Sequence, residues 1–114
     1  MARLGGSATV AVELLYFEGC PHCRRAAAAI ADATRATGVR AEVRATGISD
    51  PEDAVRRRFL GSPTVRVAGR DVEPGAGERS EHALACRVYD SDTGRAWSLP
   101  IEWIAAALRE GAGA

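Results

Sequence analysis

The sequence has no lysine and no excess of charge of either sign. Its 15 basic residues are all arginine, and 15 acidic residues balance them to a formal net charge of +0 at pH 7. Nucleic acids and anionic membranes attract proteins mainly through an excess of positive charge. The balanced composition therefore gives no electrostatic reason to expect either of them as a partner.

A long apolar run is also missing. The first apolar stretch, residues 10–17, is too short to span a bilayer and contains Glu13. It also lacks the hydrophobic region and the small-residue cleavage site of a secretory signal peptide. We therefore expect a cytoplasmic protein.

Cysteine is scarce, with three residues in the chain: Cys20, Cys23 and Cys86. In a reducing compartment, so few cysteines do not predict a framework of structural disulfides. An odd number instead indicates reactive thiols, metal-binding thiols or small core residues.

The length of 114 residues, with 46% hydrophobic and 26% charged residues, predicts one globular domain. Residues 1–9 show no periodicity and are expected to be a flexible tail, so the domain covers residues 10–111. Residues 10–17 predict a central strand covered on both faces. The alternating residues 39–45 predict an edge strand, and residues 64–68 a strand that turns at Gly69-Arg70 into residues 71–72.

Helix punctuation appears at three places. The Ala-rich residues 24–37 predict a helix with Cys20 at the N-cap, Pro21 at the first helical position and Gly38 just past the end. Residues 49–52 match a capping box that opens a short helix. Val55 and Phe59 are expected to face inward from this short helix, and Gly61 is expected to end it.

A last helix is expected after Pro100. Its core-facing stripe is Ile101, Ile104, Ala105 and Leu108. Residues 73–97 form an extended segment between the predicted elements, with a short strand over residues 86–89 and a turn over residues 90–94. Trp97 and Trp103 are expected in the core or at a helix cap.

The motif Cys20-Pro21-His22-Cys23 lies between the buried strand and the first helix. The start of a helix presents unpaired backbone N–H groups and a partial positive charge, which stabilise a thiolate and lower its pKa. The imidazole of His22 is expected to act in the same direction. Cys23 lies one helical turn further in, where it can attack a mixed disulfide. This pattern predicts Cys20 as nucleophile and Cys23 as resolving thiol.

These four residues resemble the active site of the thioredoxin-fold superfamily, and the Pro-His dipeptide is the one found in the bacterial periplasmic disulfide oxidase. A second part of the resemblance is Gly61-Ser62-Pro63-Thr64, which implies that Pro63 is a cis-proline facing the cysteines. It also implies that the backbone of Ser62 pairs with an extended substrate segment, and that Ser62, Pro63 and Thr64 shape the substrate groove. The resemblance covers roughly residues 10–110.

The resemblance implies a glutaredoxin-sized α/β domain of the thioredoxin-like fold, with a mixed four-stranded sheet in the order 2-1-3-4 and helices on both faces. The implied function is exchange of a dithiol for a disulfide with a protein or small-molecule disulfide substrate. No cofactor is needed beyond a reductase or oxidant partner, and a monomer is expected.

The sequence also departs from the family. Thioredoxins carry a buried acidic residue where this chain has Leu14, and Glu13 is expected to face the other side of the strand. The chain also lacks, near Ser98, the glycine-rich segment through which glutaredoxins bind glutathione. These departures leave the base for Cys23 unassigned and put glutathione as a cosubstrate in doubt.

The role of Cys86 and the function of the chain both leave alternatives open. Cys86 is either a small core residue or a third thiol that trades disulfides with Cys20. A thiolate-based metal protein would bind zinc or mercury through Cys20, Cys23 and Cys86, with His82 as a fourth ligand. Residues 61–71 and 86–89 are also similar to those of small actinobacterial thioredoxin-like proteins that are often labelled as organomercurial lyases, although the label alone does not predict that activity. A further hypothesis is a binding module that kept the fold and lost turnover.

Overall fold

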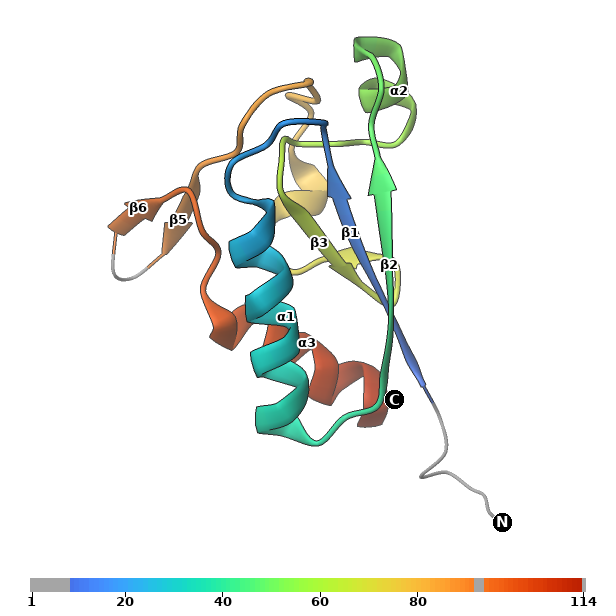
Figure 1. Cartoon of the computed structure of the whole chain (residues 1–114), viewed down its shortest axis with the longest axis vertical. Coiled ribbons are helices and arrows are strands. Elements are labelled where there is room, and N and C mark those ends of the chain that lie inside the picture. The colour runs from blue at the N-terminus through green and yellow to red at the C-terminus, as the bar shows by residue number, and fades with distance from the viewer. Residues whose placement is uncertain (1–8, 92–93, 114) are drawn as a thin grey trace.

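The computed structural model describes residues 9–91 and 94–113, so all of the predicted tail except Thr9 lies outside the described residues. The chain forms an α/β domain whose mixed sheet has the predicted order β2-β1-β3-β4 (Figure 1). The strands are β1 (Val10–Tyr16), β2 (Ala41–Gly47), β3 (Thr64–Val67) and β4 (Arg70–Asp71). β1 runs parallel to β2 and antiparallel to β3, and β3 runs antiparallel to β4.

Two helices, α1 (Cys23–Thr37) and α3 (Ile101–Gly113), lie against each other on one face of the sheet. The side chains between these helices and the sheet form the larger hydrophobic cluster of the domain. Burial of one aliphatic side chain contributes about 1.5–3 kcal/mol to the free energy of unfolding, so this cluster is the main source of stability. Of the predicted α3 stripe, Ile104, Ala105 and Leu108 are buried and Ile101 is half-buried. The buried residues that β1 and α1 contribute to this cluster are Val10, Val12, Leu14, Ala26, Ile30 and Ala33.

The prediction that β1 is covered on both faces is wrong for most of its length. On the second face, Ala11 is exposed and Glu13 half-buried, and only Leu15 is fully buried. The helix on this side, α2 (Pro51–Arg56), has six residues and lies near the end of the sheet. It therefore covers only Leu15, in a small cluster with Ile48, Ala54 and Phe59.

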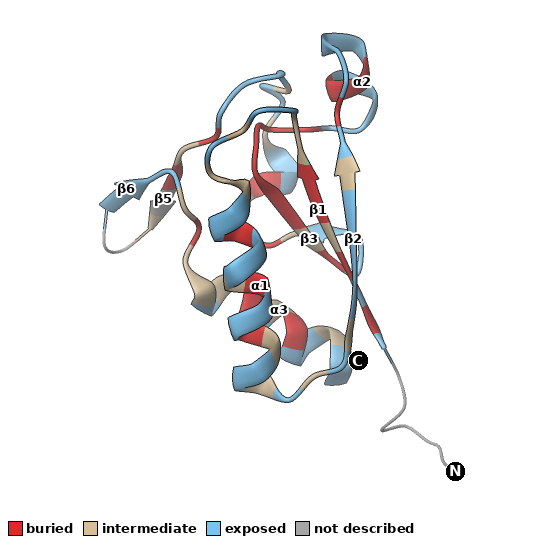
Figure 2. Ribbon diagram, viewed as in Figure 1, coloured by how far each residue is buried: buried red, intermediate tan, exposed pale blue. Residues whose placement is uncertain are grey.

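β2 lies at the edge of the sheet, as its alternation predicts, although it begins and ends two residues later than expected. Neither of its faces is well covered, and Val43 is 52% exposed (Figure 2). An open groove of about 480 Å³ separates β2 from α1 and is lined by Val43 and Ile30, among others. Within the described residues, no helix combines the length and the apolar character needed to cross a bilayer.

The helix ends differ in detail from the prediction. Cys20 is not the N-cap of α1, because the helix begins at Cys23 with His22 as its N-cap. The predicted end is confirmed: Gly38 adopts a left-handed conformation (φ 70°) and its N–H donates to the carbonyl of Thr34 at 2.9 Å. Glycine tolerates this conformation without steric cost.

The capping box of α2 lies one residue later than predicted. The Asp50 side chain caps the helix by accepting from the Asp53 N–H at 2.7 Å, and the Asp53 carboxylate accepts from the Ser49 N–H at 3.4 Å. One residue is about 100° around a helix, so Ala54 faces inward and Val55 is exposed. The helix ends at Arg56, well before the predicted stop at Gly61, while Phe59 is buried as expected.

The later turns also shift. The β3–β4 turn uses Ala68 and Gly69, both with positive φ, one residue before the predicted pair.

The extended segment 73–97 contains a 3₁₀ helix, η2 (Ala76–Glu78), and a hairpin of β5 (Tyr89–Ser91) and β6 (Gly94–Ala96). The strand predicted over residues 86–89 is therefore wrong: Cys86 forms an isolated bridge with Ser62, and β5 begins only at Tyr89. Residues 92–93 of the predicted turn lie outside the described residues.

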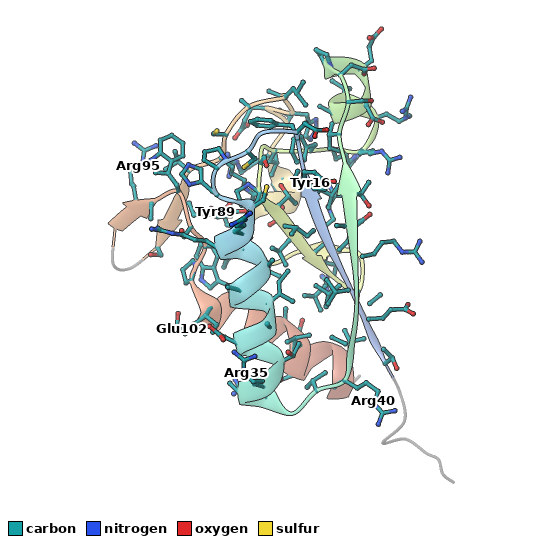
Figure 3. All side chains as sticks on the ribbon, viewed as in Figure 1. Tyr16, Arg35, Arg40, Tyr89, Arg95 and Glu102 are labelled. Carbon is teal, nitrogen blue, oxygen red and sulfur yellow. The ribbon has the colours of Figure 1, made fainter. Side chains whose placement is uncertain are left out.

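Arg87 fastens the extended segment to the sheet. Its side chain is 1% exposed, and its guanidinium donates to both carboxylate oxygens of Asp71 at 2.7 and 3.1 Å and to Glu73 at 2.6 Å. It also donates to the Thr64 hydroxyl at 2.9 Å and lies 4.5 Å from the centre of the Tyr89 ring. These bonds offset the large cost of burying a guanidinium. Tyr89, labelled in Figure 3, is itself buried.

Loss of this arginine should destabilise the domain strongly. Arg87→Met leaves the carboxylates of Asp71 and Glu73 without their shared cation, and we expect the free energy of unfolding to fall by about 3 kcal/mol. The exposed Arg109 on α3 provides the matched control, and Arg109→Met should change that free energy by less than about 0.5 kcal/mol. Urea unfolding of both variants measures the difference. Equal stabilities for the two variants would contradict the structural role of Arg87.

Candidate active site at the cysteine pair

Strand topology brings two loops to the same edge of the sheet. β1 and β3 are antiparallel with Leu15 opposite Thr64, so the residues that follow β1 lie beside those that precede β3. The first loop carries Cys20, and the second is residues 61–63. A hydrogen bond joins them, since the N–H of Phe17 donates to the Ser62 hydroxyl oxygen at 3.4 Å.

Both cysteines of the pair are free thiols and half-buried. Burial by itself raises the pKa of Cys20, but hydrogen bonds from the Ser62 hydroxyl and the backbone N–H of His22 outweigh it, with help from Cys23. The pKa of Cys20 is therefore below its ordinary value. The direction agrees with the prediction for a sulfur at a helix start.

Cys23 has the opposite shift. Its sulfur lies 3.5 Å from the Ser62 hydroxyl oxygen, and this contact lowers its pKa. Burial and, after it, the neighbouring Cys20 sulfur outweigh that effect and raise the pKa of Cys23 to about 11. At neutral pH the pair thus holds one accessible thiolate candidate, Cys20, and one thiol, Cys23.

His22 and Pro21 lie in the turn that precedes α1. The contribution of His22 to the low pKa of Cys20 comes from its backbone N–H. Its ring stacks on Trp97, with 5.3 Å between the ring centres and 1° between the planes. Trp97 is 49% exposed, so the expectation of a core or cap residue is wrong. The sequence contains no local signal for this stack, because the extended segment alone brings Trp97 to the site.

The residues expected to form a substrate groove are buried. Ser62, Pro63 and Thr64 are all fully buried, and the Ser62–Pro63 peptide bond is cis. The Ser62 N–H donates to the Ala85 carbonyl at 2.8 Å, and the Ser62 carbonyl accepts from the Arg87 N–H at 2.9 Å. The chain itself thus occupies the backbone edge that a substrate was expected to use.

Side-chain hydrogen bonds also hold this loop. The Tyr89 hydroxyl donates to the Pro63 carbonyl, and the Thr64 hydroxyl accepts from Arg87 and donates to the Gly61 carbonyl at 2.6 Å. Thr64 is therefore part of the internal network of the domain. Its buried side chain links the loop of residues 61–63 to Arg87.

Cys86 is exposed and stands opposite Ser62 in the bridge. It is therefore not the core cysteine that was one of its two interpretations. Its charge adds to the factors that raise the pKa of Cys23, which places it within electrostatic reach of the pair.

The described residues do not form the four-ligand zinc arrangement that was one of the alternatives. Among residues 9–91 and 94–113, no group of three or more His, Cys, Asp or Glu side chains could hold a metal ion. His82 instead lines a separate basin of about 840 Å³ with Arg57 and Arg58. Its loop is held there because the N–H of the next residue, Ala83, donates to the Phe59 carbonyl at 3.0 Å.

Glu13 lies away from the cysteine pair, as expected, and accepts a hydrogen bond from the Thr46 hydroxyl at 2.9 Å. Leu14 points into the core between the sheet and α1. The polar group beside Cys23 is the Ser62 hydroxyl instead. The resemblance implies a role only for the backbone of Ser62 beside the cysteines, and no pattern in the sequence indicates the role of this side chain.

Neither a protein-family model, nor a curated protein, nor a solved structure matches this chain. The chemistry of the site follows from its own geometry.

The Ser62 hydroxyl should control the ionisation of Cys20. Ser62→Ala removes a donor to the thiolate, so the pKa of Cys20 should rise. Alkylation by iodoacetamide requires the thiolate, and its rate falls as the pH drops through that pKa. The rate for Cys20, resolved from the other thiols by peptide mass spectrometry, should therefore reach its midpoint at a higher pH than in the unmodified protein.

Ser80→Ala makes the same chemical change at an exposed serine and should leave the midpoint in place. An unchanged midpoint in Ser62→Ala would show that the hydroxyl does not stabilise the thiolate.

Proposed function

We propose that this chain is a thiol–disulfide oxidoreductase that exchanges the Cys20–Cys23 dithiol for a disulfide in a protein or small-molecule substrate. Cys20 is the nucleophile and Cys23 the resolving thiol. The observation that carries the proposal is the opposite shift of two neighbouring thiols around one hydroxyl: the pKa of Cys20 is lowered and that of Cys23 is raised to about 11.

The difference between the pKa values of the two thiols suits the two steps of the exchange. The Cys20 thiolate attacks one sulfur of the substrate disulfide, the other sulfur leaves as a thiolate, and a mixed disulfide forms. Cys23 then loses its proton and attacks the sulfur of Cys20, which releases the second substrate thiol and leaves a Cys20–Cys23 disulfide. The substrate gains two electrons and the protein loses two.

The raised pKa of Cys23 keeps the two steps in order. With a pKa of about 11, only about one Cys23 in ten thousand is a thiolate at pH 7. Cys23 therefore does not compete with Cys20 for the substrate. Once Cys20 is bound in the mixed disulfide, the neighbouring sulfur that raised this pKa no longer carries charge, and the ionisation of Cys23 becomes easier.

Access to the site supports the same function. Cys20 is half-buried, and the adjacent His22–Trp97 stack is partly exposed. A flat aromatic surface next to a thiolate can hold an apolar or aromatic part of a substrate while its disulfide reacts.

Substitution of each cysteine tests the two roles. We expect Cys20→Ser to abolish the dithiothreitol-dependent reduction of insulin. Cys23→Ser should instead accumulate a mixed disulfide between Cys20 and the substrate, visible as an added mass that dithiothreitol removes. Circular dichroism of both variants serves as the control for folding. Full exchange kinetics in folded Cys20→Ser protein would falsify the nucleophile assignment.

The reduction potential should depend on the same hydroxyl. Stabilising the Cys20 thiolate favours the dithiol form and makes the pair more oxidising. We therefore expect Ser62→Ala to have a more negative potential than the unmodified protein in glutathione redox buffers. Ser80→Ala is again the matched control, and an equal or more positive potential in Ser62→Ala would contradict the link between the thiolate and the potential.

A further inference from the structure

The segment that carries Cys86 is built onto the cysteine site. Two backbone hydrogen bonds, through Ala85 and Arg87, hold it against Ser62 in a parallel bridge centred on Cys86. Arg87 is then anchored in the buried network with Asp71 and Glu73. Cys86 is thus held at a defined position although its side chain is exposed.

The bridge also fixes the direction of the Cys86 side chain. Residues opposite each other in neighbouring strands project their side chains to the same face. The Ser62 hydroxyl lies 3.5 Å from the sulfur of Cys23, so the Cys86 side chain lies on the face of the bridge that is next to the cysteine pair. The charge of Cys86 acts on Cys23, in agreement with this placement.

Gly61 leaves room for this segment. It has a φ of 128°, and a Cβ atom there would come within 2.9 Å of the Arg87 Cβ and 3.0 Å of the Ala85 carbonyl oxygen. Any larger residue would push residues 85–87 away from Ser62. The close approach of the two chains therefore requires glycine at this position.

We propose that Cys86 is a third redox thiol, which takes over the disulfide from Cys20 by attacking Cys23 and so moves it to the exposed segment 85–87. This inference rests on the proposed function, because that function supplies the Cys20–Cys23 disulfide.

The step balances without a further oxidant. The Cys86 thiolate forms a bond to the Cys23 sulfur, the Cys20–Cys23 bond breaks, and Cys20 leaves as a thiolate. The proton of Cys86 passes to solvent, and the number of disulfides is unchanged. The substrate disulfide that oxidised the pair remains the source of oxidising equivalents.

Leaving-group chemistry selects Cys23 as the atom attacked. A thiol with a low pKa leaves faster than one with a high pKa. Attack on Cys23 expels Cys20, whose pKa is lowered, whereas attack on Cys20 would expel Cys23, whose pKa is about 11. The product is a Cys23–Cys86 disulfide, and Cys20 is again a free nucleophile in the oxidised protein.

Disulfide mapping tests this transfer. The reduced full-length protein is oxidised with one equivalent of diamide, alkylated with iodoacetamide and digested for mass spectrometry. We expect peptides cross-linked between Cys23 and Cys86 that carry an alkylated Cys20, together with the Cys20–Cys23 form. In Cys86→Ser the cross-linked pair should be lost, while the Cys20–Cys23 disulfide still forms.

A variant that keeps all three cysteines tests the role of the bridge. Gly61→Ala should reduce the yield of the Cys23–Cys86 disulfide several-fold, because it displaces residues 85–87. Gly75→Ala is the matched control: Gly75 also has a positive φ, of 79°, but a Cβ there meets nothing within 4 Å. It should keep the yield of the unmodified protein, and an equal yield in folded Gly61→Ala would overturn the role of the bridge.

Two results would overturn the transfer itself. One is oxidised protein that contains only Cys20–Cys23 with Cys86 alkylated throughout, and the other is Cys86 found only in disulfides between two molecules. Either result leaves the loss of exchange in Cys20→Ser intact. Failure of this inference is therefore distinguishable from failure of the proposed function.

Discussion

The buried hydroxyl of Ser62 lies where three parts of the chain meet. It accepts a hydrogen bond from the N–H of Phe17 at the end of β1 and lies 3.5 Å from Cys23 at the start of α1. The backbone of the same residue holds Ala85 and Arg87. Buried polar groups must be hydrogen-bonded, so these parts cannot shift independently of one another. The low pKa of Cys20 depends in large part on this one residue.

The same residue explains how a small site holds two unlike thiols. One hydroxyl can donate only one hydrogen at a time, and a thiolate is the stronger acceptor. Its donation to Cys20, together with the backbone N–H of His22, outweighs burial and favours charge there. At Cys23 the same hydroxyl also lowers the pKa, but burial and the neighbouring Cys20 sulfur outweigh it and the thiol keeps its proton. The position of Cys20 at a helix start predicts the direction of its pKa shift. The size of the difference between the two thiols cannot be predicted from that position, because the desolvation of Cys23 depends on tertiary packing.

Local patterns were sufficient for the end of α1 at Gly38 and the stripe of α3, because each depends on residues within one or two turns of one another. The sheet order pairs residues that are distant in the sequence, and its prediction came from the resemblance to the thioredoxin-fold superfamily. Boundaries were less certain: one residue of shift in α2 was enough to expose Val55. Local patterns could not predict the position of the extended segment. That position depends on the contacts of Arg87 with Asp71 and Glu73, and the same segment carries Trp97 to its stack on His22. Contacts between distant residues leave no periodic signal in the sequence.

The extended segment combines strong and weak attachment. Arg87 is held by four side-chain hydrogen bonds in a buried site, whereas the contact with the Ser62 edge consists of two backbone bonds. A typical hydrogen bond contributes about 0.5–1.5 kcal/mol net to stability, because water replaces it when it breaks. The contact of residues 85–87 with the Ser62 edge is therefore the weakly attached part of the segment, and the buried Arg87 side chain is the strongly attached part.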